Sequence, residues 1–266
     1  MNIIPNKNTK HNLNIDKINM LEMIITSGKS CSFSNSPKRL SRVDRSKITN
    51  IRVRFSDHGH VENEFDASGI EDLINLKSLE VNGTGSTMSG SKFAPLVSPT
   101  IERLKIKDHI GRLTIEAPHV ENLEIINSKL DAKDLMTLRN VEYILLNRST
   151  ITGPVFFPQL RLVTNYDSDI ILEERCKNLH SLDGNCFVTV PSSVRRITLT
   201  GITSISYKEI CSFTSQSSES TILRSKLSEL TVYGTECDDE IETDGVKCTF
   251  HKGVHELGYT VSLRLH

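Results

Sequence analysis

Apolar residues recur along this chain in triplets with the spacing φ-x-x-φ-x-φ, where φ is Leu, Ile or Val. Clear copies occur at Ile48/Ile51/Val53, Leu76/Leu79/Val81, Ile101/Leu104/Ile106, Ile110/Leu113/Ile115, Val120/Leu123/Ile125, Val141/Ile144/Leu146, Val194/Ile197/Leu199 and Leu227/Leu230/Val232. Weaker copies occur at Leu160/Val163/Asn165 and Leu179/Leu182/Gly184. The last two residues of each triplet alternate as in a strand with one buried face. The pattern therefore predicts a series of short, half-buried strands.

The middle triplets follow a nearly constant step. Their first residues lie at positions 101, 120, 141, 160 and 179, which gives steps of 19, 21, 19 and 19 residues. A step of this size indicates stacked repeats. One short strand cannot bury its apolar face alone, whereas stacked neighbours form a parallel sheet over a continuous core. Pro99, Pro118 and Pro158 each lie two residues before a first triplet residue, where proline sets the chain direction without loss of a sheet hydrogen bond.

The longer steps predict short helices outside the sheet. Ser68 is a suitable N-cap for a helix that carries Ile70, Leu73 and Ile74. A second short helix is expected within residues 128–138, with its leucines facing inward. The predicted fold class is an α/β repeat solenoid. Its curved parallel β-sheet of short strands would carry few short helices and irregular segments on the convex side.

The chain divides into three predicted regions. Residues 1–46 are expected to be partly disordered, with a capping helix around residues 15–25. Residues 47–235 form the solenoid, which includes a Ser/Thr-rich loop between the last two triplets. Residues 236–266 are expected to cap the other end, with an acidic loop and a final strand over residues 260–265.

Composition and charge exclude several classes of partner. Lys and Arg number 32 and Asp and Glu number 33, so no overall field favours nucleic acid or an anionic membrane. Aromatic residues make up 5%, too few for a base-stacking platform. Polar and charged residues interrupt the N-terminal stretch, so it does not resemble a signal peptide, and no apolar run is long enough to span a membrane. The sequence therefore predicts a soluble, intracellular protein, located in the cytoplasm.

The segments LKSLEV, IERLKI and VENLEI resemble the LxxLxL strand of leucine-rich repeats. This resemblance covers roughly residues 48–235. The Asn or Cys expected soon after each strand is inconsistent here, and the steps are less regular than in that family. VPSSVRRITL is similar to the FNIP-type variant, and FPQLRLV is similar to receptor L domains. The resemblance implies a protein-interaction scaffold.

The residues between the triplet positions are expected to point outward along the concave face. The candidate partner-binding residues chosen on this basis are Arg103, Lys105, Arg112, Glu124, Tyr143, Leu145, Leu162 and Arg196. Tyr143, Leu145 and Leu162 would form an apolar patch, with basic residues on other strands. Apolar anchors ringed by charge suit a protein partner. The alternatives are that a helix or tail of the same chain covers the patch, or that the phase of the repeat slips there.

One cluster of residue types could bind zinc. Cys237, Cys248, His251 and His255 follow the spacing C-x10-C-x2-H-x3-H, and Cys and His are zinc ligands. The cysteine spacing fits no familiar finger, and Gly253 weakens the helix that would align the histidines. We therefore expect ordinary thiols and surface histidines, with no metal and no cofactor. The acidic run at 237–245 lacks the ligand pattern of a calcium loop and is expected to be a solvated loop.

The sequence contains no GxSxG, Walker, GxGxxG or HExxH motif, so it does not predict an enzyme. The leading hypothesis is a non-catalytic scaffold or adaptor that binds a protein through the concave face. A first alternative is a carbohydrate-active parallel β-helix hydrolase, in which Asp183 with Asp167 or Asp169 would supply the acids. That alternative predicts two or three strands in every coil and no helices. A second alternative is a substrate-receptor subunit that recruits other machinery through its N-terminus.

Overall fold

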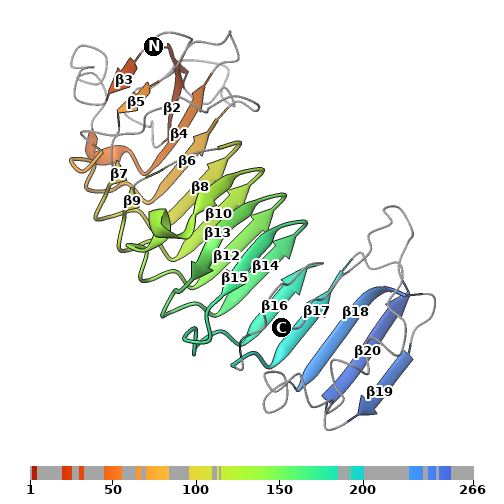
Figure 1. Cartoon of the computed structure of the whole chain (residues 1–266). Helices are drawn as coiled ribbons and strands as arrows, with labels where there is room; N and C mark the ends of the chain where they lie inside the picture. Colours follow the sequence, from red (N-terminus) through yellow and green to blue (C-terminus); the bar gives the residue numbers. More distant parts are fainter. Residues whose placement is uncertain are drawn as a thin grey trace. The chain divides into compact units, whose positions relative to one another are not determined.

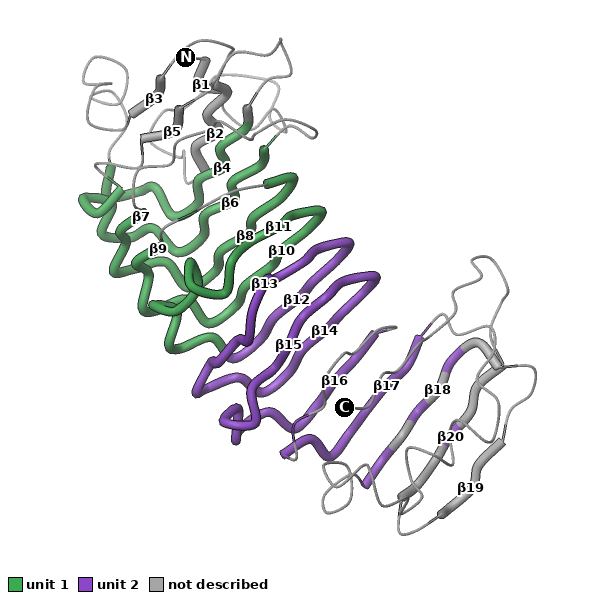
Figure 2. Tube along the Cα trace, viewed as in Figure 1, with its two compact units in different colours: residues 1–141 green, residues 142–266 purple. Residues whose placement is uncertain are grey.

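The protein is described from a computed structural model of the whole chain, drawn in Figure 1. The described residues are 2–4, 20–25, 30–32, 45–55, 64–66, 70–83, 96–109, 113, 115–184, 191, 193–200, 228–235, 239–243 and 246–252. Two compact units divide the chain at residues 141 and 142, and Figure 2 colours them separately. The region boundaries predicted at residues 46 and 235 remain predictions.

The first unit, residues 1–141, stacks short parallel strands into a main sheet. In spatial order these strands are β1 (Asn2–Ile4), β2 (Met20–Ile25), β4 (Asn50–Phe55), β6 (Ser78–Asn82), β8 (Arg103–Lys107) and β10 (Asn122–Ile126). Only the β1–β2 pair is antiparallel among the described pairs of this sheet. Short parallel pairs lie outside it: β3 (Ser30–Ser32) with β5 (Glu64–Asp66), and β7 (Leu96–Val97) with β9 (Ile115–Glu116). The unit also holds the short strand β11 (Lys129–Asp131).

The second unit, residues 142–266, repeats this arrangement. Its main sheet contains β12 (Tyr143–Asn147), β14 (Leu162–Tyr166), β16 (Ser181–Gly184), β17 (Arg196–Leu199), β18 (Glu229–Thr235), β20 (Val246–Lys252) and β19 (Asp239–Thr243). All neighbouring pairs are parallel except β19–β20. A second parallel pair joins β13 (Thr150–Val155) to β15 (Asp169–Leu172). Each unit is therefore a β-solenoid of stacked coils.

The apolar triplets form the core of the coils, as the sequence predicted. From Ile48 to Leu199, every apolar triplet residue of the described main strands is at most 3% exposed. In β8 and β10 the triplet residues alternate with half-buried or exposed neighbours. Equivalent residues of successive coils are in register, for example Leu104 with Leu123. The predicted phase of the strands is therefore confirmed.

One triplet was assigned to the wrong sheet. Ile115 lies in β9, which pairs with β7 outside the main sheet, so the triplet Ile110/Leu113/Ile115 is not a further main strand. Leu113 and Ile115 are nevertheless buried. The triplet spacing arises wherever a corner leads into a strand with one buried face. It therefore does not distinguish a strand of the main sheet from a strand of the β7–β9 pair.

The predicted helices are replaced by turns and second-sheet strands. The described residues contain no α-helix, only the 3-10 helices Arg45–Lys47 and Ala132–Leu135. Residues 70–75 form turns, in which Ile70 and Leu73 are buried as expected but Ile74 is 66% exposed. Leu130 and Leu135 face inward as expected, the first from strand β11. A corner only a few residues long lacks room to nucleate an α-helix.

Both ends of the chain differ from expectation in their described parts. Met20–Ile25, expected within a helix, forms β2 in parallel register with β4. Asp239–Thr243, expected within an acidic loop, forms β19, which pairs with β20. Backbone hydrogen bonds to a neighbouring strand are available at each end of a stacked sheet, and they outweigh the weak strand preference of these segments. The Ser/Thr-rich segment 201–227 and residues 253–266 lie outside the described residues.

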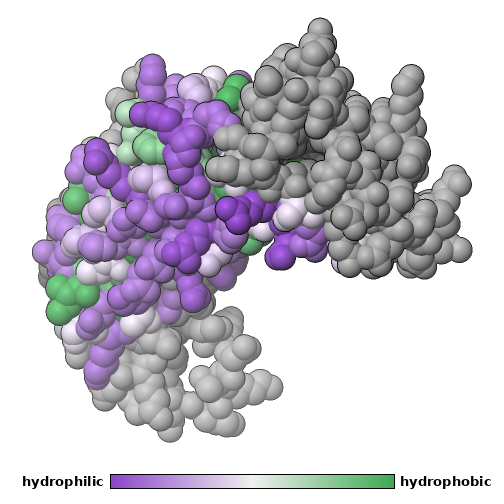
Figure 3. Space-filling view, turned by 90° about the horizontal axis from the view of Figure 1, so that it is seen from below, coloured by the Kyte–Doolittle hydropathy of each residue, from purple (hydrophilic) through white to green (hydrophobic). Residues whose placement is uncertain are grey.

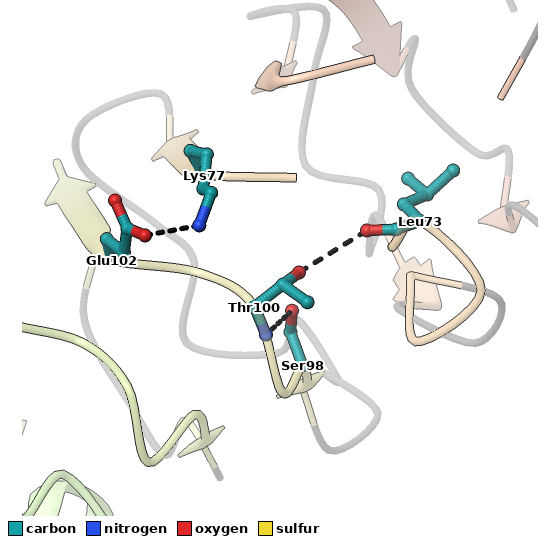
Figure 4. Close-up of polar contacts among 5 residues, drawn as sticks. All are labelled: Leu73, Lys77, Ser98, Thr100 and Glu102. Atoms are coloured by element: carbon teal, nitrogen blue, oxygen red, sulfur yellow. Dashed lines mark hydrogen bonds and ion pairs between the residues drawn. The ribbon is translucent and has the colours of Figure 1, made fainter. Parts of the chain in front are cut away.

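The corners that lead into the main strands share one hydrogen-bonding arrangement. The carbonyl oxygen just before a strand accepts two successive N–H groups of the next coil. Glu102 O, for example, accepts from Glu121 N at 2.9 Å and Asn122 N at 3.1 Å. Side chains join adjacent corners as well: Thr100 Oγ1 donates to Leu73 O at 3.3 Å, and Lys77 pairs with Glu102 (Figure 4). These corners therefore tie consecutive coils together without a helix.

The corners that follow the main strands are also repeated. Asp108, Asn127, Arg148 and Asp167 each adopt a positive φ between 46° and 53°. The next residue in three of these corners is a buried serine: Ser128, Ser149 or Ser168. Within the second unit, Ser168 Oγ accepts from Ser149 N at 2.9 Å and donates to Tyr166 O at 2.7 Å. The serines therefore satisfy buried backbone groups that the turn leaves unpaired by the sheet.

We expect Ser168→Ala to reduce the free energy of unfolding by about 1–3 kcal/mol, because it removes the acceptor of a buried N–H. Urea denaturation followed by circular dichroism would measure the loss. Ser181→Ala, a half-exposed position on the outward face of β16, is the matched control and should change stability by less than about 0.5 kcal/mol. Equal losses in the two variants would contradict a role for the buried serine.

Candidate partner-binding surface

The outward side chains of the main strands form straight rows, because the strands are parallel and in register. In the first unit the middle row consists of Arg52, Glu80, Lys105 and Glu124, taken from β4, β6, β8 and β10. Charges alternate along this row. Arg52 Nε lies 2.6 Å from Glu80 Oε2, and Lys105 Nζ lies 2.7 Å from Glu124 Oε2. Two of the predicted binding residues, Lys105 and Glu124, therefore pair with each other.

We expect Glu80→Lys to reduce stability by about 1–2 kcal/mol at low salt, because it places three cations side by side on adjacent strands. The Glu80 side chain is only 19% exposed, which limits screening by solvent. Denaturation at low and at 1 M salt would measure the effect, which should shrink at high salt. Glu80→Gln, which removes the attraction without adding repulsion, should lose less. A loss that is the same at both salt concentrations would rule out charge pairing as its cause.

The second unit holds the predicted apolar patch. Tyr143 on β12 is in register with Leu162 on β14, and Leu145 lies two residues beyond Tyr143 on the same face. Tyr143 is 41% exposed, and the two leucines are half-buried. Described residues of the same chain therefore leave the tyrosine ring accessible. On the face seen in Figure 3, hydrophilic residues predominate and hydrophobic ones form small separate groups.

The structure divides the remaining predicted residues between the units. Arg103 is exposed on β8 in the first unit. Arg196 is exposed on β17 in the second, where its Nε lies 2.7 Å from Glu229 Oε2. Arg112 lies outside the described residues, and its triplet leads into β9 rather than a main strand. The outward positions in the described main strands were thus predicted correctly, but the eight residues do not belong to a single unit.

Sequence reasoning missed the residues that immediately precede the main strands of the second unit. Arg161, His180 and Arg195 occupy this position before β14, β16 and β17, and all three are exposed. The alternation rule would have turned them inward, because each lies two residues before a buried one. The corner carbonyls that accept two N–H groups interrupt the alternation and turn these side chains outward. A comparison of equivalent positions across the repeats would have revealed their shared basic character.

The three aspartates of the enzyme alternative do not share a face. Asp183 is on the outward face of β16 in the main sheet, whereas Asp169 is exposed on β15, in the second sheet. Asp167 occupies the positive-φ turn between β14 and β15. Burial raises the pKa of the Asp183 carboxyl, and one of its oxygens has no hydrogen-bond partner. A paired arrangement of carboxylates for glycoside hydrolysis needs two acids that flank one bond, which this placement does not provide.

Two of the four candidate zinc ligands lie beyond the described part of the chain. Cys248 and His251 lie in β20, an extended strand, so the helical spacing proposed for the histidines does not apply to His251. Cys237 and His255 lie outside the described residues. The buried Cys176 is a free thiol, and its pKa is raised by burial.

None of the described helices is long and apolar enough to cross a membrane. Comparison of the chain with models of known families, with curated proteins and with solved structures gave no significant match.

Proposed function

We propose that this protein is a non-catalytic interaction scaffold, or adaptor, that binds a protein partner through the outward face of a main sheet. The observation that carries the proposal is the exposed ring of Tyr143 beside Leu145 and Leu162 on adjacent parallel strands. Tyrosine is enriched among the residues that dominate binding energy at protein interfaces. A sheet face held by stacked coils is also preorganised, so little ordering entropy is lost on binding.

The resemblance of the strands to leucine-rich repeats supports the same proposal, since such repeats present a sheet to protein partners. The second-sheet strands in place of helices are a difference from the predicted α/β arrangement. They favour the coil architecture that the hydrolase alternative predicted, with two strands in some coils. The placement of Asp167, Asp169 and Asp183 on different faces does not favour the chemistry of that alternative. Recruitment through residues 1–46 remains a further alternative.

The test is the double substitution Tyr143→Arg and Leu162→Arg in the full chain. We expect the variant to remain folded by circular dichroism and to lose specific partners in affinity purification followed by mass spectrometry, because two cations replace the apolar anchors. Lys129→Glu, an exposed charge reversal on β11 outside the main sheet of the first unit, is the matched control and should retain those partners. A folded double variant that keeps every partner would overturn the proposal. Loss of folding would show that these side chains are core, and the single variant Tyr143→Ser would then replace it.

A further inference from the structure

The outward faces of the two units differ in the charged side chains of their middle rows. The middle row of the first unit alternates basic and acidic residues that pair with each other. From β12 to β20, the corresponding row of the second unit contains one carboxylate among apolar and hydroxyl side chains. In strand order it consists of Leu145, Thr164, Asp183, Thr198, Thr231 and Thr249. The first unit therefore neutralises its middle row, whereas from β12 to β20 the middle row of the second unit is nearly uncharged, so a partner can cover it at a lower desolvation cost.

Basic residues lie along one edge of the same sheet, beside this nearly uncharged row. We define the basic edge as Arg161, His180, Arg195 and Arg196. Its first three members are stacked on consecutive coils: His180 N donates to Arg161 O at 3.1 Å, and Arg195 N donates to His180 O at 3.0 Å. Side chains at equivalent positions of neighbouring parallel strands are about 4.8 Å apart. Arg161 and Arg195 therefore lie two coils apart, on either side of His180, so the three basic side chains line one edge of the sheet.

The basic edge is only partly neutralised by its own unit. Arg161 Nε lies 3.6 Å from Glu142 Oε2, beyond hydrogen-bond distance, and Arg196 pairs with Glu229 at 2.7 Å. Among the described residues no carboxylate lies within ion-pair distance of Arg195, whose side chain is exposed. His180 Nδ1 lies 2.7 Å from Arg161 O, which fixes the ring and leaves its other nitrogen directed away from that bond. At least one arginine is therefore available to a partner carboxylate.

We propose that the second unit binds an extended acidic protein segment that crosses its main strands. An apolar side chain of the segment lies against Tyr143 and Leu162, and its carboxylates lie against Arg195 and Arg196. Tyr143, Leu162, Ser181 and Arg196 form one row. The distance from the midpoint of Tyr143 and Leu162 to Arg196 on β17 is about 12 Å, which three to four residues of extended chain would span. The expected motif is an apolar residue followed three or four positions later by Asp or Glu. This inference rests on the proposed function and specifies its partner.

A protein segment fits this surface better than a uniform anionic polymer. Nucleic acid or a sulfated sugar would use the arginines but would leave the apolar pair uncovered, and the described residues of the second unit do not form the continuous positive surface that such polymers require. A peptide can satisfy both parts of the surface, and the threonine row offers hydroxyl groups to its backbone.

The experiment is selection of a random twelve-residue peptide library on the full chain, followed by fluorescence anisotropy of a synthetic selected peptide. We expect enrichment of peptides with the apolar-to-acidic spacing given above. Arg195→Glu should weaken a selected peptide about tenfold or more, and Arg196→Gln should weaken it less, because Arg196 already pairs with Glu229. Raising the salt concentration should also weaken binding. Lys129→Glu, an exposed position on β11 outside the main sheet of the first unit, is the matched control and should leave the affinity unchanged.

The outcomes separate this inference from the proposed function. Peptides that lose binding in the Tyr143→Arg and Leu162→Arg variant but not in Arg195→Glu would overturn the acidic segment while supporting the apolar anchor. Peptides without a bias toward Asp and Glu, or no enrichment at all, would likewise overturn it. Heparin is the control for recognition of charge alone. If heparin displaces the selected peptide completely, and if the Tyr143 and Leu162 substitutions do not change heparin binding, the inference is contradicted. An Arg195→Glu variant that binds a peptide with Lys in place of its acidic residue would support it most directly.

Discussion

Gly184→Ala is expected to reduce the free energy of unfolding by at least about 3 kcal/mol. Gly184 ends β16 with a φ of +134°, a region that residues with a side chain rarely adopt. A Cβ atom at this position would lie 1.9 Å from the backbone oxygen of Asn165 on β14. Because that atom is backbone, relief requires movement of the strand rather than rotation of a side chain. Backbone strain at the positive φ and displacement of a packed coil together account for the size of the expected loss of stability.

Urea denaturation and hydrogen exchange would measure the effect of Gly184→Ala. Slowly exchanging amides of β14 and β16 should become unprotected before those of the first unit. Gly153→Ala is the matched control, because Gly153 also has a positive φ, of 95°, but is half-exposed in β13. It should carry the conformational cost with a smaller loss of stability. If both glycines tolerate alanine equally, the close approach of Gly184 to Asn165 does not limit stability.

Phe157→Ala is expected to cost about 3–5 kcal/mol, the usual range for removal of a buried aromatic side chain. Phe157 is 1% exposed and is among the largest fully buried side chains of the described residues. It lies in the corner between β13 and β14, near the buried thiol of Cys176, whose Sγ lies 3.8 Å from Val155 O. Because this corner is tied to the next coil through Cys176, the cavity left by the ring is expected to close only in part.

Reactivity of Cys176 gives a second, local measurement for Phe157→Ala. Burial raises the pKa of this thiol and excludes reagents, so the wild-type residue should label slowly with a maleimide, as mapped by mass spectrometry. The alanine variant should label faster at the same pH. Phe157→Leu, which fills most of the volume, should lose less stability and keep Cys176 protected. Slow labelling in the alanine variant would mean that the corner collapses into the cavity, and the loss of stability should then fall below the expected range.

The weaker triplets illustrate where a sequence pattern misleads. Asn165 and Gly184 looked like decayed third positions, yet both are buried and face each other in register on β14 and β16. Asn165 Nδ2 donates to Ser168 O at 3.0 Å, inside the corner that follows β14. Gly184 allows the close approach of the two backbones. The backbone at position 165 requires glycine at position 184, and the Asn165 side chain binds its own corner, so both residues have structural roles in the stacked coils.

The sequence by itself determined the buried face of the described main strands, the step between coils and which side chains look outward, including Tyr143 and Leu162. The physical reason is that strand pleating and apolar burial act over a few residues, so a local pattern is sufficient. The tertiary structure alone decided that the corners form second-sheet strands instead of helices, that Met20–Ile25 and Asp239–Thr243 join the sheets, and that Arg161, His180 and Arg195 stack on one edge. Those outcomes depend on backbone groups supplied by a neighbouring coil, which no segment of the sequence contains.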